Sequence, residues 1–507
     1  MTIEEEDKDT KWVYKHKDEG QVCAVASLGL IHLWDSDTGC DSLDRFSYTD
    51  NNFVKAGMLL GVGIVNNKIR DQYERAMGLL NENVGMEHPD IIRIASIFGL
   101  GLAYSGTGNQ DVNDLLTPIL AENDSNISVV SFAALALGLI NVSSCNNDIV
   151  EAFIQNPFFE RSETDLGSSI GLLLALGLGL IFLGKGEECD VALETLSGIL
   201  EGKKSVSPSI LTTIEVCAYA GTGNVLKVQK MLSICTDHPE KEQKEQAIAA
   251  LGVGLISIGE EIGSKMVLRS YDHLLQYGEP MIRKACPLAI GMLSISNPEV
   301  SIMDTLSKLS HDHDSNVACS AILGLGLISA GTNNSRAAQL LRSLSEYYYK
   351  DQNQLFMVRI SQALLHCGKG TLSLSPYHSH KLYLNKVSLA GILITLFASL
   401  DVETNLFQRP YLLYSLVCSL ETRMLITIDE ENNPVPINVR VGKAVDTVGQ
   451  AGKPKTITGF QTYSTPVLLG NDDRAEFVTE EYIAISPILE GVVVVKKNPN
   501  FVAEENK

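Results

Sequence analysis

A block of small and aliphatic residues that closes on a glycine recurs along most of this chain. The clearest copies lie at residues 99–108, 177–186, 252–259 and 324–331. Each block is apolar at nearly every position, which predicts a helix that is buried on all sides. More amphipathic stretches lie between the blocks, as at 111–120. This alternation predicts pairs of helices, one fully buried and one half-exposed.

The blocks repeat with a nearly constant period. Their second small position falls at Gly29, Gly63, Gly101, Gly138, Gly179, Val216, Gly254, Gly291, Gly326 and Ala363. The successive intervals are 34, 38, 37, 41, 37, 38, 37, 35 and 37 residues. A period of roughly 34 to 47 residues is typical of solenoids built from two-helix repeats. We therefore predict a mainly α fold, an alpha-solenoid of ten such repeats.

Glycine occupies that aligned position in eight of the ten copies. It costs a helix about 1 kcal/mol relative to alanine, so its recurrence needs a packing reason. We expect the backbones of neighbouring buried helices to approach each other closely at these positions. The glycines that close each block are expected to adopt the left-handed conformation that ends a helix.

The repeat pattern ends after Gly370, and the character of the chain then changes. Residues 377–423 predict two or three ordinary helices. Alternating and β-branched runs from Met424 onward predict strands, at 425–428, 437–441, 455–462 and 491–495. The predicted layout is a linker remnant at 1–20, the repeats at 21–371, helices at 372–423 and a small β-rich domain at 424–507.

The net charge indicates which partners are favoured, and the cysteines indicate a reducing environment. Lys and Arg number 40 against 61 Asp and Glu, and the net charge of −21 would repel a nucleic acid backbone and favour partners with basic faces. The ten cysteines stand singly, without a CxxC pair, as reduced core residues do. The acidic first residues do not resemble a signal peptide, and the apolar stretch 170–184 is shorter than the ~20 residues that span a bilayer. We expect a protein of the cytoplasm and nucleus, without membrane or nucleic acid partners.

Two segments suggest chemistry that their surroundings do not support. Segment 179–186 matches most of a phosphate-binding loop, but Gly186 stands where Ser or Thr would bind magnesium, and no strand is expected before it. The cluster 311–314 could bind a metal ion only with poor geometry. Helix capping by Asp314 or Ser315 is the simpler interpretation. We therefore expect no catalytic residue, no cofactor and no metal ion.

The glycine-rich blocks resemble the proteasome/cyclosome repeats of the two large non-ATPase subunits of the 26S proteasome. Longer stretches resemble the C-terminal half of one of these two subunit families, at 11–20, 217–229, 331–334, 368–371 and 448–460. The resemblance extends over about residues 9–500. It implies that the repeats close into a toroid around central helices. Family members carry a long helical region before the segment equivalent to 11–14, so we expect this chain to be a fragment or a shortened version.

The resemblance also implies a function. In the family, the subunit is a non-catalytic scaffold that docks to the proteasomal ATPase ring. Its outer helices receive ubiquitin chains and the ubiquitin-like domains of shuttle factors, and a second surface holds a deubiquitinase through its ubiquitin-like domain. Acidic side chains beside exposed aliphatic ones would complement the basic rims of such partners. The alternative is a free-standing solenoid adaptor outside the proteasome.

The family's receptor acids follow a Cys-Asn-x-Asp turn, which in this chain is 145–148. Asp148 matches the first acid, Gln155 replaces the second, and Glu160 corresponds to the third. The change at Gln155 would weaken a charge contact. Asp148 has an alternative role as the N-cap of a helix that begins at Ile149.

The second surface is expected in the loop 34–39, near the first repeat. The resemblance points to Asp35 and Asp37 as the residues that would contact the deubiquitinase. A solvated acidic turn without a partner is the equal alternative.

Overall fold

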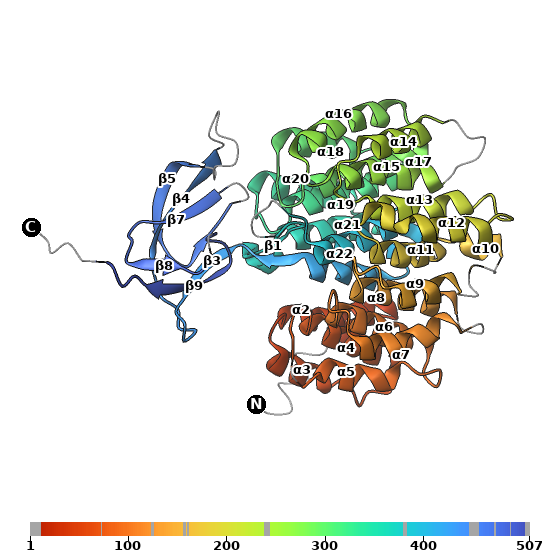
Figure 1. The fold of residues 1–507 in the computed structure, drawn as a ribbon, viewed down its shortest axis with the longest axis horizontal. Helices are drawn as coiled ribbons and strands as arrows, with labels where there is room; N and C mark the ends of the chain where they lie inside the picture. Colours follow the sequence, from red (N-terminus) through yellow and green to blue (C-terminus); the bar gives the residue numbers. More distant parts are fainter. Residues whose placement is uncertain are drawn as a thin grey trace, which may run out of the picture. The chain divides into compact units, whose positions relative to one another are not determined.

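The computed structural model describes residues 12–71, 73–122, 126–155, 159, 162–237, 244–378, 383–445, 456–470, 473–486 and 488–501. The chain divides into two compact units (Figure 1). Unit 1 comprises Met1–Leu293, Thr305–Gly324 and Leu384–Ser419, and unit 2 comprises Ser294–Asp304, Leu325–Tyr383 and Leu420–Lys507.

Apolar helices carry the repeated small positions of unit 1. They are α2 (Glu19–Ile31), α4 (Asn52–Val65), α6 (Asp90–Ala103), α8 (Ile127–Ile140), α11 (Ser169–Ile181), α13 (Ser207–Ala218), α15 (Lys244–Ser257) and α17 (Pro280–Leu293). Each of these helices packs against the next along the chain. The apolar stretch 170–184 therefore forms most of a buried core helix, α11, as predicted. No helix among the described residues combines the length and the apolar character needed to cross a membrane.

Half-exposed helices alternate with the apolar ones, as the pattern predicts. They are α3 (Ser36–Asp44), α5 (Arg75–Leu80), α7 (Gln110–Leu120), α9 (Asn147–Ile154), α12 (Asp190–Ile199), α14 (Val225–Thr236) and α16 (Glu261–Tyr277). Shorter turns are η1 (Val13–Lys15), η2 (Asn81–Asn83), α10 (Glu163–Leu166) and η4 (Gly186–Cys189). Helices α18 (Val300–Leu309) and α19 (Ser315–Ser329) contribute residues to both units.

The repeated glycines let neighbouring backbones touch. A Cβ atom added to Gly63 of α4 would lie 2.4 Å from the carbonyl oxygen of Gly99 in α6. The same addition at Gly138 would lie 2.4 Å from the carbonyl oxygen of Gly177. Such distances are far below van der Waals contact, so a side chain at either position would force the helices apart. The predicted close approach is confirmed.

The closing glycines end one helix and bind the next repeat. Gly106 and Gly184 have φ angles of 69° and 68°, in the left-handed region expected of them. The Gly106 amide donates to the Leu139 carbonyl of α8 at 2.8 Å, and the Gly184 amide donates to the Cys217 carbonyl of α13 at 3.0 Å. Each turn therefore joins consecutive repeats through the backbone.

Helix α22 (Lys386–Ser399) lies within the arc of unit 1. It is buried along almost its whole length and contacts α8, α11 and α17. The 3₁₀ helix η7 (Pro410–Ser419) packs on α22 and on α2 and α6, after the π-helical turn η6 (Val402–Leu406). Within its described residues, the segment 377–423 thus holds one ordinary helix, not the two or three predicted. The Ser415 hydroxyl of η7 donates to the Gly391 carbonyl of α22 at 2.8 Å. Tertiary contacts such as this one override local helix propensity.

Unit 2 holds the last helices and the β-rich end of the chain. Its helical elements are α20 (Ser335–Tyr347), α21 (Gln352–Leu365) and η5 (Cys367–Gly370). A two-stranded antiparallel sheet, which the sequence did not predict, joins β1 (Leu372–Leu374) to β2 (Leu420–Thr422). It pairs the segment after the last repeat with the segment that opens the β-rich end.

The predicted C-terminal strands are confirmed in two open sheets among the described residues. The strands are β3 (Met424–Ile428), β4 (Asn438–Val445), β5 (Thr456–Ser464), β6 (Val467–Leu468), β7 (Asp473–Phe477), β8 (Tyr482–Ala484) and β9 (Val492–Lys497). Their orders are β6-β3-β9-β8 and β5-β4-β7. Strands β3 and β9 pair in parallel, with Thr427 opposite Val493. Alternate residues such as Val439 and Val441 are buried in the core of this part.

A buried ion pair ties an apolar helix to the half-exposed helix of its own repeat. Glu215 of α13 is 7% exposed and accepts hydrogen bonds from Lys227 at 2.7 Å and Lys230 at 2.6 Å, both on α14. Burial alone would raise the pKa of Glu215, but the lysine hydrogen bonds outweigh it, and the net pKa lies below the ordinary value of 4.5. The Lys227 ammonium also lies 4.2 Å from the centre of the Tyr219 ring.

We expect Gly63→Ala to destabilise the protein by about 3 kcal/mol, because the new methyl group meets the Gly99 carbonyl. Gly198→Ala is the matched control, since Gly198 lies inside α12 with no atom within 4 Å of an added Cβ. It should stabilise slightly, by up to about 1 kcal/mol. Thermal unfolding of the full chain, followed by circular dichroism, measures both. Equal midpoints for the two variants would contradict the packing argument.

Glu215→Gln should lower stability by about 2 kcal/mol at neutral pH, since it removes hydrogen bonds to two charged groups. Because the folded-state pKa of Glu215 is lowered, its contribution is present above the ordinary value of 4.5 and is lost as the pH falls through the folded-state pKa. The two melting temperatures should therefore differ at pH 7 and converge only as the pH falls below the ordinary value of 4.5 and through the lowered folded-state pKa. The exposed Glu194→Gln variant should match the wild type throughout. A difference that persists in acid would contradict the assignment.

Candidate functional site

A short connecting segment, 141–146, separates the apolar helix α8 from α9. Asn146 is its N-cap, and the Asn146 side-chain oxygen accepts a hydrogen bond from the Asp148 amide at 3.1 Å. The capping role considered for Asp148 is therefore wrong, because the helix starts two residues earlier than expected. Cys145 precedes the cap with a φ angle of 52° and donates its amide to Ile181 at 3.3 Å, which fixes where the turn ends.

The exposed face of α9 is acidic and amide-bearing. Asp148, Glu151 and Gln155 are exposed, whereas Ile149 and Phe153 on the opposite face are buried. The Gln155 amide nitrogen donates to the Glu151 carboxylate at 2.7 Å. Among the residues that the structure describes, none makes a hydrogen bond or ion pair with the Asp148 carboxylate. Two of the predicted site residues thus share one face, and Glu160 lies outside the described residues.

Glu151 was missed by sequence reasoning. It lies three residues after Asp148 and four before Gln155, which is the spacing of residues on one helical face. Once the helix is known to start at Asn147, this spacing identifies Glu151 as the acid beside Gln155. A carboxylate is therefore present next to Gln155 on the exposed face of α9.

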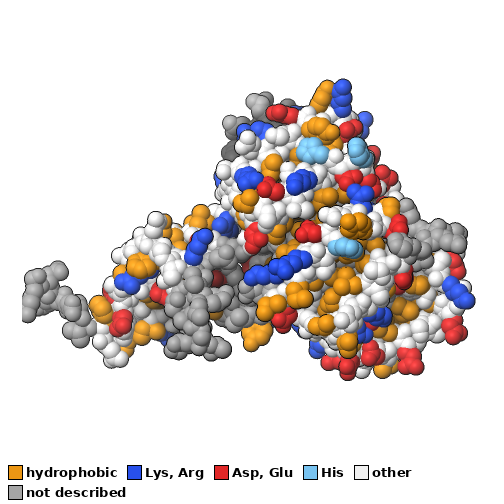
Figure 2. All heavy atoms as spheres, turned by 90° about the horizontal axis from the view of Figure 1, so that it is seen from above, with side chains coloured by type: hydrophobic (Ala, Val, Ile, Leu, Met, Phe, Trp, Pro, Cys, Tyr) orange, Lys and Arg blue, Asp and Glu red, His pale blue; other side chains and the backbone are white. Residues whose placement is uncertain are grey.

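The neighbouring helix α12 extends this surface. Helices α9 and α12 are in contact, and α12 carries the exposed acids Asp190 and Glu194 together with Val191, which is 77% exposed. Exposed hydrophobic side chains also occur elsewhere. Figure 2 shows them between positive and negative side chains on the face of the molecule that it displays. We call Asp148, Glu151, Asp190, Val191 and Glu194 the acidic face.

The residues predicted for the second surface are engaged within the chain. Asp35 caps α3, and its carboxylate accepts a hydrogen bond from the Thr38 amide at 3.3 Å. The Asp37 side chain is 77% exposed and forms an ion pair with Arg75 of α5. The hydrogen bond to Asp37 raises the pKa of the Arg75 guanidinium above its usual value. Arg75 also pairs with Asp71 at 3.1 Å, so one arginine connects the α3 acid to the next loop.

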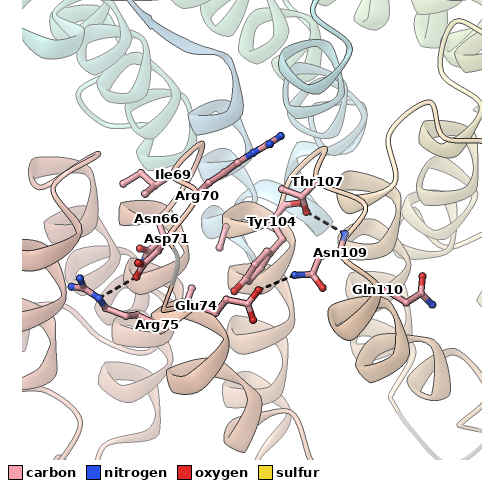
Figure 3. Close-up of a pocket in the computed structure, with 12 residues that line it drawn as sticks. Asn66, Ile69, Arg70, Asp71, Glu74, Arg75, Tyr104, Thr107, Asn109 and Gln110 are labelled. Atoms are coloured by element: carbon pink, nitrogen blue, oxygen red, sulfur yellow. Dashed lines mark hydrogen bonds and ion pairs between the residues drawn. The ribbon is translucent and has the colours of Figure 1, made fainter. Parts of the chain in front are cut away.

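A cavity of about 380 Å³ opens beside this arginine (Figure 3). Its walls come from the loop after α4 and the turn after α6. The lining residues are Asn66, Ile69, Arg70, Asp71, Glu74, Arg75, Ala76, Ala103, Tyr104, Thr107, Asn109 and Gln110. The cavity lies between consecutive repeats, where the two connecting segments diverge.

The structural context of the remaining candidates is not that of catalytic chemistry. Gly179 lies inside α11, so a helix and not a strand precedes Lys185, which pairs with Glu188 at 3.9 Å. Asp314 accepts a hydrogen bond from the Asn316 amide at 2.9 Å, which is the predicted capping role. No group of three or more potential metal ligands occurs in the part of the chain that the structure describes. Burial raises the pKa of thiols such as Cys189 to about 12, which keeps them protonated at neutral pH.

Comparison with known proteins identifies the family. The model of the proteasome/cyclosome repeat matches residues 95–129 and 320–354, and that of the C-terminal region of 26S proteasome non-ATPase regulatory subunit RPN1 matches residues 448–501. The chain is 47% identical to 26S proteasome regulatory subunit rpn-1 of Neurospora crassa, over 100% of this chain and 56% of the relative. It is 48% identical to 26S proteasome non-ATPase regulatory subunit 2 of Dictyostelium discoideum, over 99% of this chain and 55% of the relative.

A third relative agrees with these. The chain is 48% identical to 26S proteasome non-ATPase regulatory subunit 2 homolog A of Arabidopsis thaliana, over 97% of this chain and 54% of the relative. The chain thus spans about half the length of the curated relatives it matches. Its repeats, its C-terminal strands and these identities agree, and the chain belongs to the family of 26S proteasome non-ATPase regulatory subunit 2.

Proposed function

We propose that this chain is a non-catalytic scaffold and receptor of the 26S proteasome regulatory particle. It docks to the ATPase ring and receives ubiquitin chains and the ubiquitin-like domains of shuttle factors on its acidic face. The observation that carries this proposal is the free Asp148 carboxylate, which capping by Asn146 leaves exposed in the first turn of α9. A non-catalytic role agrees with the relatives, which are named as regulatory and non-ATPase subunits.

The charge and shape of the acidic face support a receptor role. Asp148 and Glu151 lie on α9, and Asp190 and Glu194 lie on the adjacent α12, so carboxylates line two helices in contact. Val191 adds an exposed apolar side chain beside them. A basic rim around an apolar patch is the complementary surface. Glu151 supplies a charge next to Gln155, which offsets the missing second acid.

The second surface, at Asp35 and Asp37, is the proposed contact for a deubiquitinase. Asp37 is the stronger candidate, because its carboxylate is exposed although it pairs with Arg75. Exposed ion pairs contribute little to stability, so a partner's cation can compete with Arg75 at small cost. Asp35 supports the surface by capping α3.

Asp148→Arg should weaken binding of an isotopically labelled ubiquitin-like domain roughly tenfold, and Glu151→Arg should weaken it similarly, since each reverses a charge on the acidic face. The measurement is an NMR titration of the labelled domain with the full chain. Binding by the wild type should also weaken as salt is raised.

Glu346→Arg is the matched control, because it makes the same change of net charge at an exposed position on a different half-exposed helix, α20. It should bind as the wild type does. Equal affinities for Asp148→Arg, Glu151→Arg and Glu346→Arg, with no salt dependence, would remove the acidic face as the receptor.

Size fractionation under native conditions separates the scaffold proposal from its alternative, a free-standing solenoid adaptor. A subunit of the regulatory particle should migrate with the proteasome at megadalton mass in a lysate of cells that express the chain. The fraction should contain ATPase ring subunits after affinity capture. Migration at the mass of the 55.1 kDa chain alone would favour the adaptor.

A further inference from the structure

The lining of the cavity beside Arg75 includes a buried hydrogen-bond acceptor, the Asn66 side-chain oxygen, for which the described residues supply no donor. Asn66 is 4% exposed, and its amide nitrogen donates to the Val62 carbonyl at 2.8 Å. The Asn66 side-chain oxygen is buried and has no hydrogen-bond partner in the described part of the chain. The same holds for one Asp71 carboxylate oxygen, although that oxygen lies 3.1 Å from Arg75 as an ion pair. A buried acceptor without a donor is costly.

Glu74 and Tyr104 both line the cavity. In Figure 3 their side chains point toward one another, and the Asn109 amide reaches the Glu74 carboxylate at 3.4 Å. Tyr104 is half-buried, and burial together with the charges of Glu74 and Asp71 raises its pKa. Both carboxylates therefore act on the same aromatic ring. A ring next to negative charge attracts a cation.

The lining also carries two arginines, Arg70 and Arg75. Arg75 pairs with Asp37 and Asp71. Arg70 extends away from Glu74 and Tyr104 in Figure 3. The acceptors of the lining are thus the unpartnered Asn66 amide oxygen and the carboxylates of Asp71 and Glu74, with the Tyr104 ring in the same lining.

We propose that this cavity binds the guanidinium group of an arginine side chain of a partner protein. A guanidinium is planar and always charged, and it carries five N–H donors and no acceptor, so it can reach acceptors on several walls while it stacks on Tyr104. An ammonium is a single point charge and fits such a spread of acceptors less well. The cavity volume of about 380 Å³ falls within the range of roughly 300–1,000 Å³ that is usual for binding pockets. This proposal does not depend on the receptor role of the acidic face.

The test uses the full chain and the peptide acetyl-Gly-Arg-Gly-amide, with saturation-transfer NMR as the readout. The arginine side-chain protons should receive saturation. The citrulline peptide, which has nearly the same shape but no charge, should bind roughly tenfold more weakly. Glu74→Gln should weaken the arginine peptide to a similar extent, and it changes an exposed side chain, so the fold should persist.

Glu82→Gln is the matched control, because Glu82 is exposed in the same repeat but does not line the cavity. It should leave binding unchanged. Equal binding of the arginine and citrulline peptides to the wild type would overturn the proposal, as would unaltered binding by Glu74→Gln. The last measurement uses methylguanidinium in place of the peptide. If methylguanidinium binds as tightly as the peptide, the cavity binds free guanidinium compounds, and the proposal that its ligand is an arginine of a partner protein is overturned.

Discussion

Contact between the backbones of neighbouring helices is the constraint on which the rest of the structure depends. At Gly63 an added methyl group would lie 2.4 Å from the next helix, and at Gly29 it would lie 2.7 Å from the carbonyl oxygen of Gly61. Each glycine costs about 1 kcal/mol of helix propensity, and the buried aliphatic side chains around it offset that cost. At these positions no side chain lies between the two helices, so their backbones pack in direct contact.

Backbone hydrogen bonds also link neighbouring repeats. The left-handed turns bind each repeat to the next through backbone hydrogen bonds, as Gly221 does to Leu255 at 2.9 Å. The same bonds place the starts of successive half-exposed helices in similar positions. Residues on α9 and α12 can therefore act together although more than thirty residues separate Asp148 from Asp190. The apolar helices form the buried core of the repeats, whereas the half-exposed helices and the turns lie at the surface.

Much of this architecture could be predicted from the sequence, because the same pattern of small and aliphatic residues recurs ten times. The buried helices, the glycine contacts and the four predicted C-terminal strands follow from period and composition. The 3₁₀ winding of η7 was not predicted, and its contacts with α22, such as the bond from Ser415 to the Gly391 carbonyl, are tertiary and do not show in a local pattern. The β1–β2 pairing joins residues about fifty apart, and short strands such as Leu372–Leu374 carry too few residues for a pattern.

The candidate site was less predictable for a related reason. Its residue types were visible, but their roles depend on which residue starts a helix and which side chains meet. A shift of two residues in the start of α9 moved Asp148 from the cap to the first turn. The link from Asp37 through Arg75 to Asp71 joins two repeats and leaves no trace in local sequence.

Asparagine caps relieve a first-turn acid of the capping role where one is present, at Asp111 of α7 and Asp148 of α9. The half-exposed helices α7, α9, α14 and α20 each begin with a side-chain oxygen of asparagine as the cap, at Asn109, Asn146, Asn224 and Asn334. Asparagine caps a helix as well as aspartate does, so a neutral residue satisfies the first amides. An acid in the first turn, such as Asp148, still interacts favourably with the helix dipole but is not needed as a cap. Its carboxylate can then meet a partner's cation without weakening the helix that presents it.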